Sequence, residues 1–448
     1  MTLPPVFAAS ALYDSLLQAA LRQFFSRATF ETEPIPSLSS DGRLAIEPTK
    51  DPSVLSIRWF GSRHVLHVPA PRPFTDHEVR LAQAIGAVLA ARYRAIFDPK
   101  QMLERGELFR GAIEDRYVGA FVDSLIYGHP GQTRADLVAT VIEALRVAAM
   151  SSYENRPISS GVLLLEGDDD PVKPGHAGSE YAYQYSPALT RIKSFYRLSD
   201  GLQTLFMVNR GGIVLDIVEV ARYVSDGRLR VPCPTAYRAH ALATAQSHNV
   251  SIVLSPSHEI KVFAEGAQVF SFRNARWDLL DLQAKYEMWA ESVGNPALAE
   301  RLFQTAFDLA DARQGALFVV LREPTASLPQ LVAPGDQLDI IRATSAATPT
   351  RWQLLHMLRG RSAMDLDPAV LAGLARTDGA TVMDGSGRLL AVGAILLHTE
   401  PPEPHSTLAV EGARTTAAMA AGRYGAVLKV SEDGLITFYD EQERIWDI

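Results

Sequence analysis

The chain has 448 residues, of which 47% are hydrophobic and 21% are charged. This composition is typical of a globular protein and excludes an intrinsically disordered one, and the length predicts two to four domains. The formal net charge of -8 argues against a broad nucleic-acid-binding surface, although a local anion site needs only a few donors. The single cysteine, Cys233, excludes an intramolecular disulfide and favours a reducing compartment.

No segment resembles a targeting or membrane-spanning sequence. The N-terminal run MTLPPVFAASALYDSLL lacks a basic region, and Asp14 interrupts its apolar residues. No stretch approaches the ~18 consecutive apolar residues of a transmembrane helix. We therefore expect a soluble, cytoplasmic protein with neither a membrane nor a nucleic acid as its partner.

Residues 1–100 predict a small α+β module. Residues 8–28 have helical periodicity, and SVLSIRWF and RHVLHVP form a predicted strand pair joined at Gly61-Ser62. Thr75 and Glu78 have the spacing of a capping box at the start of a long helix. Such a module is either a sensor resembling a GAF domain or an element for packing and dimerisation.

Residues 101–275 predict a second domain, with helices first and strands afterwards. Helical patterns in GAIEDRYVGAFVDSLIYG and RADLVATVIEALRVAAM precede a buried strand, SSGVLLLE. The pattern from 203 to 270 is mostly that of strands: QTLFMV, GGIVLDIV, VSIVLS, IKVFAEG and AQVFSF.

Residues 276–448 predict a third domain. Helices return at 276–312, where Asn295 and Pro296 have the order of an N-cap and a first helical residue. GALFVVL is a predicted buried strand, and two helices follow, TRWQLLHMLRG and a second that starts at Asp367-Pro368. The expected fold class is α/β (α+β), with mixed central sheets flanked by helices.

The blocks 155–270 and 310–440 share a layout that indicates a duplicated fold. Each opens with a glycine and an apolar strand, and each ends with an arginine, an Ala-rich helix and a strand that finishes in serine. The spacing from Arg238 to Ser255 equals the spacing from Arg414 to Ser431. In this alignment Arg210 of the first copy stands where the second has Asp378, and an arginine cannot ligate a metal. Chance similarity of two α/β units is the alternative explanation.

The second copy carries residues suited to a nucleotide. Asp378 lies on a Gly-Ala turn that opens an apolar strand, Gly412 and Arg414 lie at a helix start, and a later strand ends in Ser431-Glu432-Asp433. Carboxylates are suitable ligands for a metal ion, and a helix N-terminus is a suitable site for a phosphate. The sequence therefore predicts a nucleotide site near the C-terminus.

This set of motifs resembles the diadenylate cyclase domain over about residues 285–445. The matches are GALFVV, Asp378-Gly379-Ala380, LLAVGAILL and Ser431-Glu432-Asp433. The family's GTRHRAA helix start reads GARTTAA here, so Thr415 and Thr416 replace a histidine and an arginine. The first copy, at about 155–270, resembles a degenerate version of the same domain.

The resemblance implies an enzyme that condenses two ATP molecules into cyclic di-AMP and releases pyrophosphate. Asp378 and Arg414 are the implied catalytic residues, and the implied metal, Mg²⁺ or Mn²⁺, is expected on Asp378, Asp433 and Glu432. The remaining implied nucleotide-binding residues are Gly379, Ala380, Leu396, Gly412, Thr415, Thr416 and Ser431. Arg423 and Lys429 are the basic residues considered as substitutes for the missing His-Arg pair.

Family catalysis needs two domains face to face, which implies a homo-oligomer. A pseudo-dimer of the first copy with the second within one chain is the alternative. Two other functions stay open: a catalytically inactive homologue that senses ATP or a cyclic dinucleotide, and an enzyme with a different nucleotide product.

Several other conspicuous residues have plainer interpretations. Ordinary surface or packing roles are expected for the histidines His240, His248 and His258, a solvated loop for Asp168 to Asp170, core packing for Trp352 and Trp446, and a hairpin turn for Asp384-Gly385-Ser386-Gly387.

Overall fold

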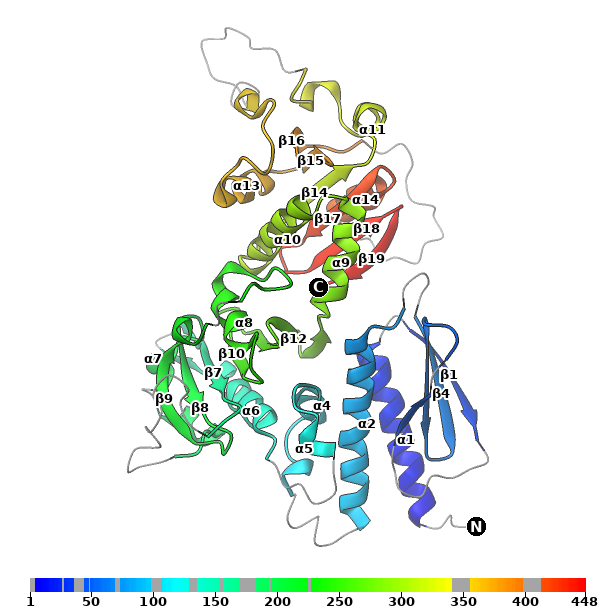
Figure 1. The fold of residues 1–448 in the computed structure, drawn as a ribbon, viewed down its shortest axis with the longest axis vertical. Coiled ribbons are helices and arrows are strands. Elements are labelled where there is room, and N and C mark those ends of the chain that lie inside the picture. Colours follow the sequence, from blue (N-terminus) through cyan, green and yellow to red (C-terminus); the bar gives the residue numbers. More distant parts are fainter. Residues whose placement is uncertain are drawn as a thin grey trace. The chain divides into compact units, whose positions relative to one another are not determined.

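The computed structural model describes residues 5–25, 28–35, 44–47, 49–68, 73–97, 106–128, 135–153, 156–168, 183–192, 195–224, 227–340, 355–397 and 412–448. The fold is a mixed α+β fold, as expected, and it divides into two compact units (Figure 1). Unit 1 comprises Met1–Leu229 and Ala239–Asp281, and unit 2 comprises Arg230–Arg238 and Leu282–Ile448. The finer division into three domains stays a prediction. Among the described residues, no helix is both long enough and apolar enough to cross a membrane.

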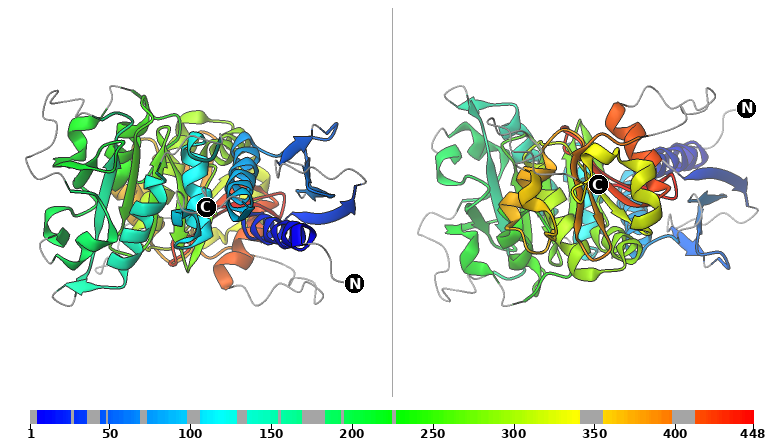
Figure 2. Two further views of the ribbon diagram at one scale, coloured as in Figure 1. Left: turned by 90° about the horizontal axis from the view of Figure 1, so that it is seen from below. Right: turned by 90° about the horizontal axis from the view of Figure 1, so that it is seen from above.

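Unit 1 begins with a small α+β module. Its elements are α1 (Pro5–Phe24), β1 (Thr29–Pro34), β2 (Ala45–Glu47), β3 (Val54–Trp59), β4 (Ser62–His67) and α2 (Asp76–Phe97). The strands form an antiparallel sheet in the order β1-β4-β3-β2. The predicted pair is present, with Trp59 opposite Ser62, and α1 and α2 lie side by side (Figures 1 and 2).

The predicted capping box at the start of α2 is confirmed. The backbone N–H of Glu78 donates to Thr75 Oγ1 at 3.1 Å, and the backbone N–H of Thr75 donates to Glu78 Oε2 at 3.0 Å. Two N–H groups that the helix itself leaves without partners are satisfied in this way, which fixes the start of the helix.

The rest of unit 1 is a helical layer on a larger sheet. Its elements are η1 (Gly106–Phe109), α4 (Ile113–Val122), α5 (Leu125–Gly128), α6 (Leu137–Ala149), β5 (Ser152–Tyr153), β6 (Arg156–Pro157), β7 (Ser160–Leu164), η2 (Pro187–Arg191), α7 (Phe195–Leu198), β8 (Thr204–Val208), β9 (Val214–Glu219), η3 (Val220–Tyr223), α8 (Arg238–Thr244), β10 (Val250–Leu254), β11 (Ile260–Ala264), β12 (Ala267–Arg273) and β13 (Arg276–Leu279). The described strands of this sheet follow the order β13-β12-β11-β10-β7-β8-β9, and one hydrophobic cluster runs from Tyr13 to Trp277.

The structure corrects two sequence predictions in this region. Residues 276–279 form strand β13 and not the start of a helix, because Trp277 inserts into the core and donates from Nε1 to Asp115 Oδ1 at 2.8 Å. The predicted single helix over residues 111–128 is broken after Val122, where Asp123 Oδ1 accepts the backbone N–H of Leu125 at 3.1 Å and starts a separate turn.

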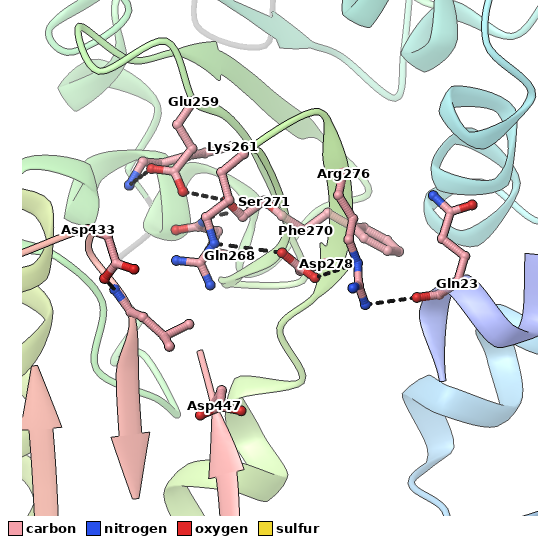
Figure 3. A network of polar contacts seen from close by, with 12 residues as sticks. Gln23, Glu259, Lys261, Gln268, Phe270, Ser271, Arg276, Asp278, Asp433 and Asp447 are labelled. Carbon is pink, nitrogen blue, oxygen red and sulfur yellow. Dashed lines mark hydrogen bonds and ion pairs between the residues drawn. The ribbon is translucent and has the colours of Figure 1, made fainter. Parts of the chain in front are cut away.

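Polar side chains are also buried in the sheet of unit 1. Lys261 Nζ lies 3.3 Å from Glu259 Oε2, and Ser271 Oγ donates to Glu259 Oε1 at 2.6 Å (Figure 3). Burial opposes ionisation of Glu259, but Lys261 and the Ser271 hydroxyl hold the pKa of this carboxyl below its usual range. At the edge of the sheet, the side chain of Arg276 donates to the carbonyl of Gln23 at 2.8 Å, which connects β13 to α1 (Figure 3).

Unit 2 is a second sheet with helices on both faces. Its elements are η4 (Thr235–Tyr237), α9 (Leu282–Val293), α10 (Pro296–Asp311), β14 (Ala316–Leu321), α11 (Pro324–Leu331), η5 (Pro334–Asp336), η6 (His356–Leu358), α13 (Pro368–Ala375), β15 (Ala380–Asp384), β16 (Leu389–Ala394), α14 (Ala413–Gly422), β17 (Gly425–Val430), β18 (Ile436–Asp440) and β19 (Glu443–Asp447). The described strands follow the order β16-β15-β14-β17-β18-β19.

The two faces of this sheet are covered by different helices. On one face Ala418 and Ala421 of α14 join the core cluster of Val319, Val427 and Tyr439. On the other face, aromatic side chains of α9 and α10 meet the strands: Trp289 lies 5.4 Å from Phe438, and Phe303 lies 5.9 Å from Trp446, between ring centroids.

The predicted N-cap of α10 is confirmed, because Asn295 Oδ1 accepts the backbone N–H of Leu298 at 3.2 Å. The predicted helix over TRWQLLHMLRG lies partly outside the described residues. Its described part contains the 3-10 turn η6.

The shared layout predicted for the two blocks is present in the topology. Strands β7, β8, β9, β10, β11 and β12 occupy the same order in their sheet as β14, β15, β16, β17, β18 and β19 in theirs, with β13 added at one edge. In both sheets the first two of these strands are parallel and the other described neighbours are antiparallel. Helix α8 precedes β10 as α14 precedes β17. Matched order and direction support the duplication inferred from the sequence.

The register of the strands corrects the sequence alignment of the two copies. The β8–β9 turn holds Asn209, whose backbone N–H donates to the carbonyl of Ile213, and the β15–β16 turn holds Asp384, whose backbone N–H donates to the carbonyl of Arg388. Phe206 occupies the position beside β7 that Thr381 occupies beside β14. Asp378 lies three residues before Thr381, so its counterpart is Gln203, three residues before Phe206. Arg210 lies in the hairpin turn and is not the counterpart.

Candidate functional site

Three of the predicted site residues meet at one edge of the sheet of unit 2. Arg414 Nη2 lies 3.9 Å from Asp378 Oδ1, and Arg414 Nη1 lies 3.6 Å from Glu432 Oε1. The topology explains this convergence. Strand β15 is parallel to β14 and β17 is antiparallel to it, so the start of β15 and the end of β17 lie at the same edge.

Gly315 makes room for the arginine of this cluster. A Cβ atom added to Gly315 would overlap Nη1 of Arg414, so the guanidinium lies directly against the backbone at the start of β14. Sequence analysis identified Gly315 only as the opening of a strand.

The Asp378-Gly379-Ala380 turn is set by contacts within the protein. Gly379 has φ +103°, and an added Cβ would meet the backbone of Gly393 and Ala394. Ala380 and Leu396 are buried in the core, so their side chains face the protein interior. Ile395 is 77% exposed and directly follows Gly393 and Ala394, whose backbone lies against Gly379. Sequence analysis did not identify Ile395 as a residue of this site.

The N-terminus of α14 carries positive charge and has no acidic residue in its first turn. Gly412 is its N-cap and makes no side-chain capping bond. The first N–H groups of any helix have no partner within the helix, and together with the helix dipole they favour an anion. Thr415 is buried, and its hydroxyl accepts a hydrogen bond from Lys429 Nζ at 2.7 Å, whereas Thr416 is half-buried.

The three predicted metal ligands differ in their neighbours and hydrogen bonds. Asp378 and Glu432 are exposed beside Arg414, with Asp378 fully so. Asp433 belongs to the β17–β18 turn, where its Oδ1 accepts the backbone N–H of Leu435 at 3.2 Å. Ser431 is in the same turn and donates its backbone N–H to the carbonyl of Leu435 at 2.9 Å.

Within the described ranges, no three His, Cys, Asp or Glu side chains form a group able to hold a metal ion. Mg²⁺ is usually bound by one or two carboxylates together with substrate phosphates. The pair Asp378 and Glu432 fits that donor set, and metal ligation by these residues stays a prediction.

The corresponding edge of unit 1 is filled by its own side chains. Ser199 Oγ accepts the backbone N–H of Gly161 at 3.1 Å and donates to the carbonyl of Thr204 at 2.9 Å. Asp200 Oδ1 accepts backbone N–H groups of residues 202, 203 and 204. The Asp200 carboxylate at this edge is thus used by a local turn, and Gln203 stands in place of Asp378, which favours a structural role for that edge.

His240 closes the same edge of unit 1. Its ring nitrogens lie 2.9 Å from Ser251 Oγ and 3.1 Å from the carbonyl oxygen of Leu202. Burial lowers the pKa of His240 to about 4. A neutral imidazole therefore joins α8, β10 and the loop before β8, which agrees with the packing role expected for it.

Other predictions concern residues away from this site. The hairpin at Asp384 is confirmed, since Asp384 Oδ1 accepts the backbone N–H groups of Ser386 and Arg388 at 2.9 and 3.1 Å. Trp446 is buried in the core. Trp352, Asp169 and Asp170 lie outside the described residues.

The comparisons with known proteins give no family assignment. No protein-family model matches the chain, and no curated protein matches it. A hypothetical membrane-spanning protein from Bacillus cereus shares 18% identity over 37% of this chain and 70% of its own, with a TM-score of 0.26. A double mutant of DacA from Staphylococcus aureus shares 20% identity over 37% of this chain and 89% of its own, with a TM-score of 0.20. Neither similarity carries an argument about this chain.

Proposed function

We propose that unit 2 binds ATP and acts as a diadenylate cyclase, forming cyclic di-AMP and pyrophosphate. The observation that supports this proposal is the meeting of Asp378, Arg414 and Glu432 at one sheet edge. Residues separated by up to 54 positions in the sequence are brought within ion-pair distance of one arginine, in the order that the resemblance implies.

In this proposal, the 3′-hydroxyl oxygen of one ATP attacks the α-phosphorus of a second. A new P–O bond forms, the bond to pyrophosphate breaks, and the hydroxyl proton is lost. Two such steps complete the ring. Arg414 and the N-terminus of α14 would bind and orient the phosphates, because phosphoryl transfer depends mainly on positioning and on neutralising charge.

Asp378, with Glu432 beside it, would hold Mg²⁺ or Mn²⁺, an ion that lowers the pKa of a bound hydroxyl and neutralises phosphate charge. The exposed position of Asp378 leaves its carboxylate accessible. To bind the metal, Asp378 would have to break its ion pair with Arg414, and Arg414 would turn to the phosphates. Reaction between two nucleotides would bring two such units face to face, so we expect a homo-oligomer.

The alternative function is a nucleotide or cyclic-dinucleotide sensor without catalysis. The observation that favours it is the replacement of a His-Arg pair by Thr415 and Thr416, with Thr415 buried. Loss of a charged hydrogen bond costs about 1.5–3 kcal/mol, or roughly 10- to 100-fold in rate.

The test is incubation of the purified full chain with ATP and Mg²⁺ or Mn²⁺, with products identified by mass spectrometry. Cyclic di-AMP is expected, and its formation should be lost in Asp378→Asn. Asp339→Asn is the matched control, because Asp339 is an exposed carboxylate of the same unit paired with Arg388 at the hairpin end of β16. ATP binding without any product from the unmodified chain would favour the sensor.

A further inference from the structure

We propose that unit 1 contains a binding site for a small α-amino acid with an apolar side chain. The site is a cavity of about 330 Å³ lined by residues of α2, α6 and the large sheet. It lies where β7 and β8 end and β10 begins, at the edge of the sheet opposite to Gly161 and Ser199. The inference concerns a different unit from the proposed cyclase site and does not rest on that function.

The topology of the sheet explains why a cavity forms at this edge. Strands β7 and β8 are parallel neighbours, so their carboxyl ends lie together, and the antiparallel strand β10 begins beside them. Leu164, Arg210 and Val250 line the cavity from these three chain segments. Ligands of α/β proteins commonly bind in the crevice beyond the carboxyl ends of parallel strands. The counterpart of the proposed nucleotide site lies at the other edge, so this cavity is a separate feature.

Much of the cavity lining is apolar. The apolar side chains in the lining are Val122, Leu125, Ile126, Leu137, Val138, Leu164, Leu165 and Val250. A cavity of roughly 150 Å³ is large enough for a benzene ring. The volume in unit 1 is about twice as large, so it accommodates the side chain of leucine, phenylalanine or tryptophan together with the charged groups of the amino acid.

Charged side chains of both signs also line the cavity. They are Arg80, Asp123, Glu166, Arg210, His248 and Glu265. Arg80 Nη1 lies 2.6 Å from Glu265 Oε1, and Asp123 Oδ1 accepts the backbone N–H of Leu125 at 3.1 Å. Arg80, Glu265 and Asp123 therefore already have partners within the protein.

Glu166 and Arg210 are neighbours of opposite charge that do not form an ion pair. The backbone N–H of Arg210 donates to the carbonyl of Gly167 at 3.0 Å, which places the two residues on adjacent chain segments. Both side chains are exposed. Glu166 Oε2 accepts the backbone N–H of His248 at 3.4 Å, whereas the guanidinium of Arg210 makes no hydrogen bond or ion pair with any described residue. An α-amino acid would bridge them, with its ammonium group on Glu166 and its carboxylate on Arg210.

This pair of charges distinguishes an amino acid from ligands with a single charge. A carboxylate without an amino group would meet Glu166 as a like charge, and an amine without a carboxylate would meet Arg210 in the same way. Like charges placed together in a binding site are unfavourable and exclude the wrong ligand. Both charged groups of the ligand are therefore expected to contribute to its affinity.

The experiment is isothermal titration of the full chain with L-leucine, L-phenylalanine and L-tryptophan at neutral pH. Each amino acid is compared with the acid that lacks its amino group and with the amine that lacks its carboxylate. For phenylalanine these analogues are hydrocinnamate and phenethylamine. We expect at least one of the amino acids to bind, and both of its analogues to bind about tenfold or more weakly.

Substitutions at Arg210 and Glu166 test the location of the site. Amino-acid affinity should fall about tenfold or more in Arg210→Met and in Glu166→Gln. The matched controls are Arg222→Met and Glu143→Gln, which make the same charge changes at exposed positions of unit 1 outside the cavity lining. Affinity should change less than about twofold in these controls.

The inference would be overturned if none of the three amino acids binds, or if an analogue binds as tightly as its amino acid. Equal affinities in Arg210→Met and Arg222→Met would also overturn it. Thermal melting checks that each variant folds, and Glu166→Gln decides the question if Arg210→Met is unstable. Because no nucleotide is used, the outcome is independent of the test for cyclic di-AMP formation.

Discussion

Arg414 Nη2 lies 3.9 Å from Asp378 Oδ1, so the residue proposed to bind phosphate is also the counter-ion of the residue proposed to bind metal. Glu432, at 3.6 Å from Nη1, shares the same guanidinium. In the proposed reaction Arg414 would release the two carboxylates and bind phosphate oxygens. The carboxylates would then bind a metal ion. The side chain of Arg414 thus connects the phosphate-binding and metal-binding parts of the proposed site.

Gly315→Ala should move Arg414 away from Asp378 and Glu432 without changing any charge. The added methyl group would overlap Arg414 Nη1, so the guanidinium must leave its place between the two acids. We expect cyclic di-AMP formation to fall about tenfold or more, because loss of one charged hydrogen bond costs about 1.5–3 kcal/mol.

The matched control for this substitution is Gly335→Ala, where an added Cβ has no neighbour within 4 Å. Activity is measured by product mass spectrometry, and thermal melting checks that both variants fold. Full activity in Gly315→Ala would show that the position of Arg414 against β14 is not needed for turnover.

Asp115 should be one of the most sensitive positions in unit 1. Its Oδ1 accepts hydrogen bonds from Arg146 at 2.6 Å and from Trp277 at 2.8 Å, and burial raises the pKa of this carboxyl. Asp115→Ala removes the acceptor of both donors, which leaves Trp277 Nε1 unpaired in the core and the half-buried Arg146 without its carboxylate. The expected loss is about 3–5 kcal/mol in the free energy of unfolding.

Asp115→Asn keeps an acceptor for Trp277 and should lose less than Asp115→Ala. Glu114→Gln, which alters a neighbouring carboxylate that accepts neither of these two hydrogen bonds, should change the free energy of unfolding by less than about 1 kcal/mol. Urea unfolding followed by tryptophan fluorescence measures all three variants. Similar midpoints for Asp115→Ala and Glu114→Gln would contradict the role assigned to the network.

Local signals in the sequence predicted much of the fold. The capping box of Thr75 and Glu78, the N-cap Asn295 and the hairpin at Asp384 each depend on atoms within a few residues, and each is confirmed. Apolar runs located the β3–β4 pair and the central strands of the two larger sheets, whereas the sequence did not predict β1, β2, β5, β6, β13 and β19. Strand β13 was missed because four residues of mixed polarity, RWDL, carry little periodicity, and its place is set by the distant Asp115.

The site was predictable only in part, for the same reason. Motif order identified Asp378, Arg414 and Glu432, but neither the contact of Arg414 with Gly315 nor that of Lys429 with Thr415 has a local signature. Both depend on how β14 and β17 pair beneath α14. The alignment of Asp378 with Arg210 failed because two similar Gly-containing turns flank strand β8, and only the strand register distinguishes them.

His240 should make the stability of unit 1 depend on pH. Burial lowers the pKa of His240 to about 4, whereas a histidine in an unfolded chain titrates near ~6.5. Between these values the unfolded chain binds a proton that the folded chain does not. The free energy of unfolding is therefore highest above pH ~6.5 and falls as the pH is lowered toward 4, by about 3 kcal/mol in all.

Urea midpoints measured from pH 7.5 to 4 should show this decline in the unmodified chain. His240→Gln has no ionisable group at the site, so its midpoint should decline less over the same window, although its stability at pH 7.5 is lower. His248→Gln, which changes an exposed histidine, should keep the decline of the unmodified chain. An unchanged decline in His240→Gln would mean that other groups produce the pH dependence and that the neutral imidazole between Ser251 and Leu202 is not its source.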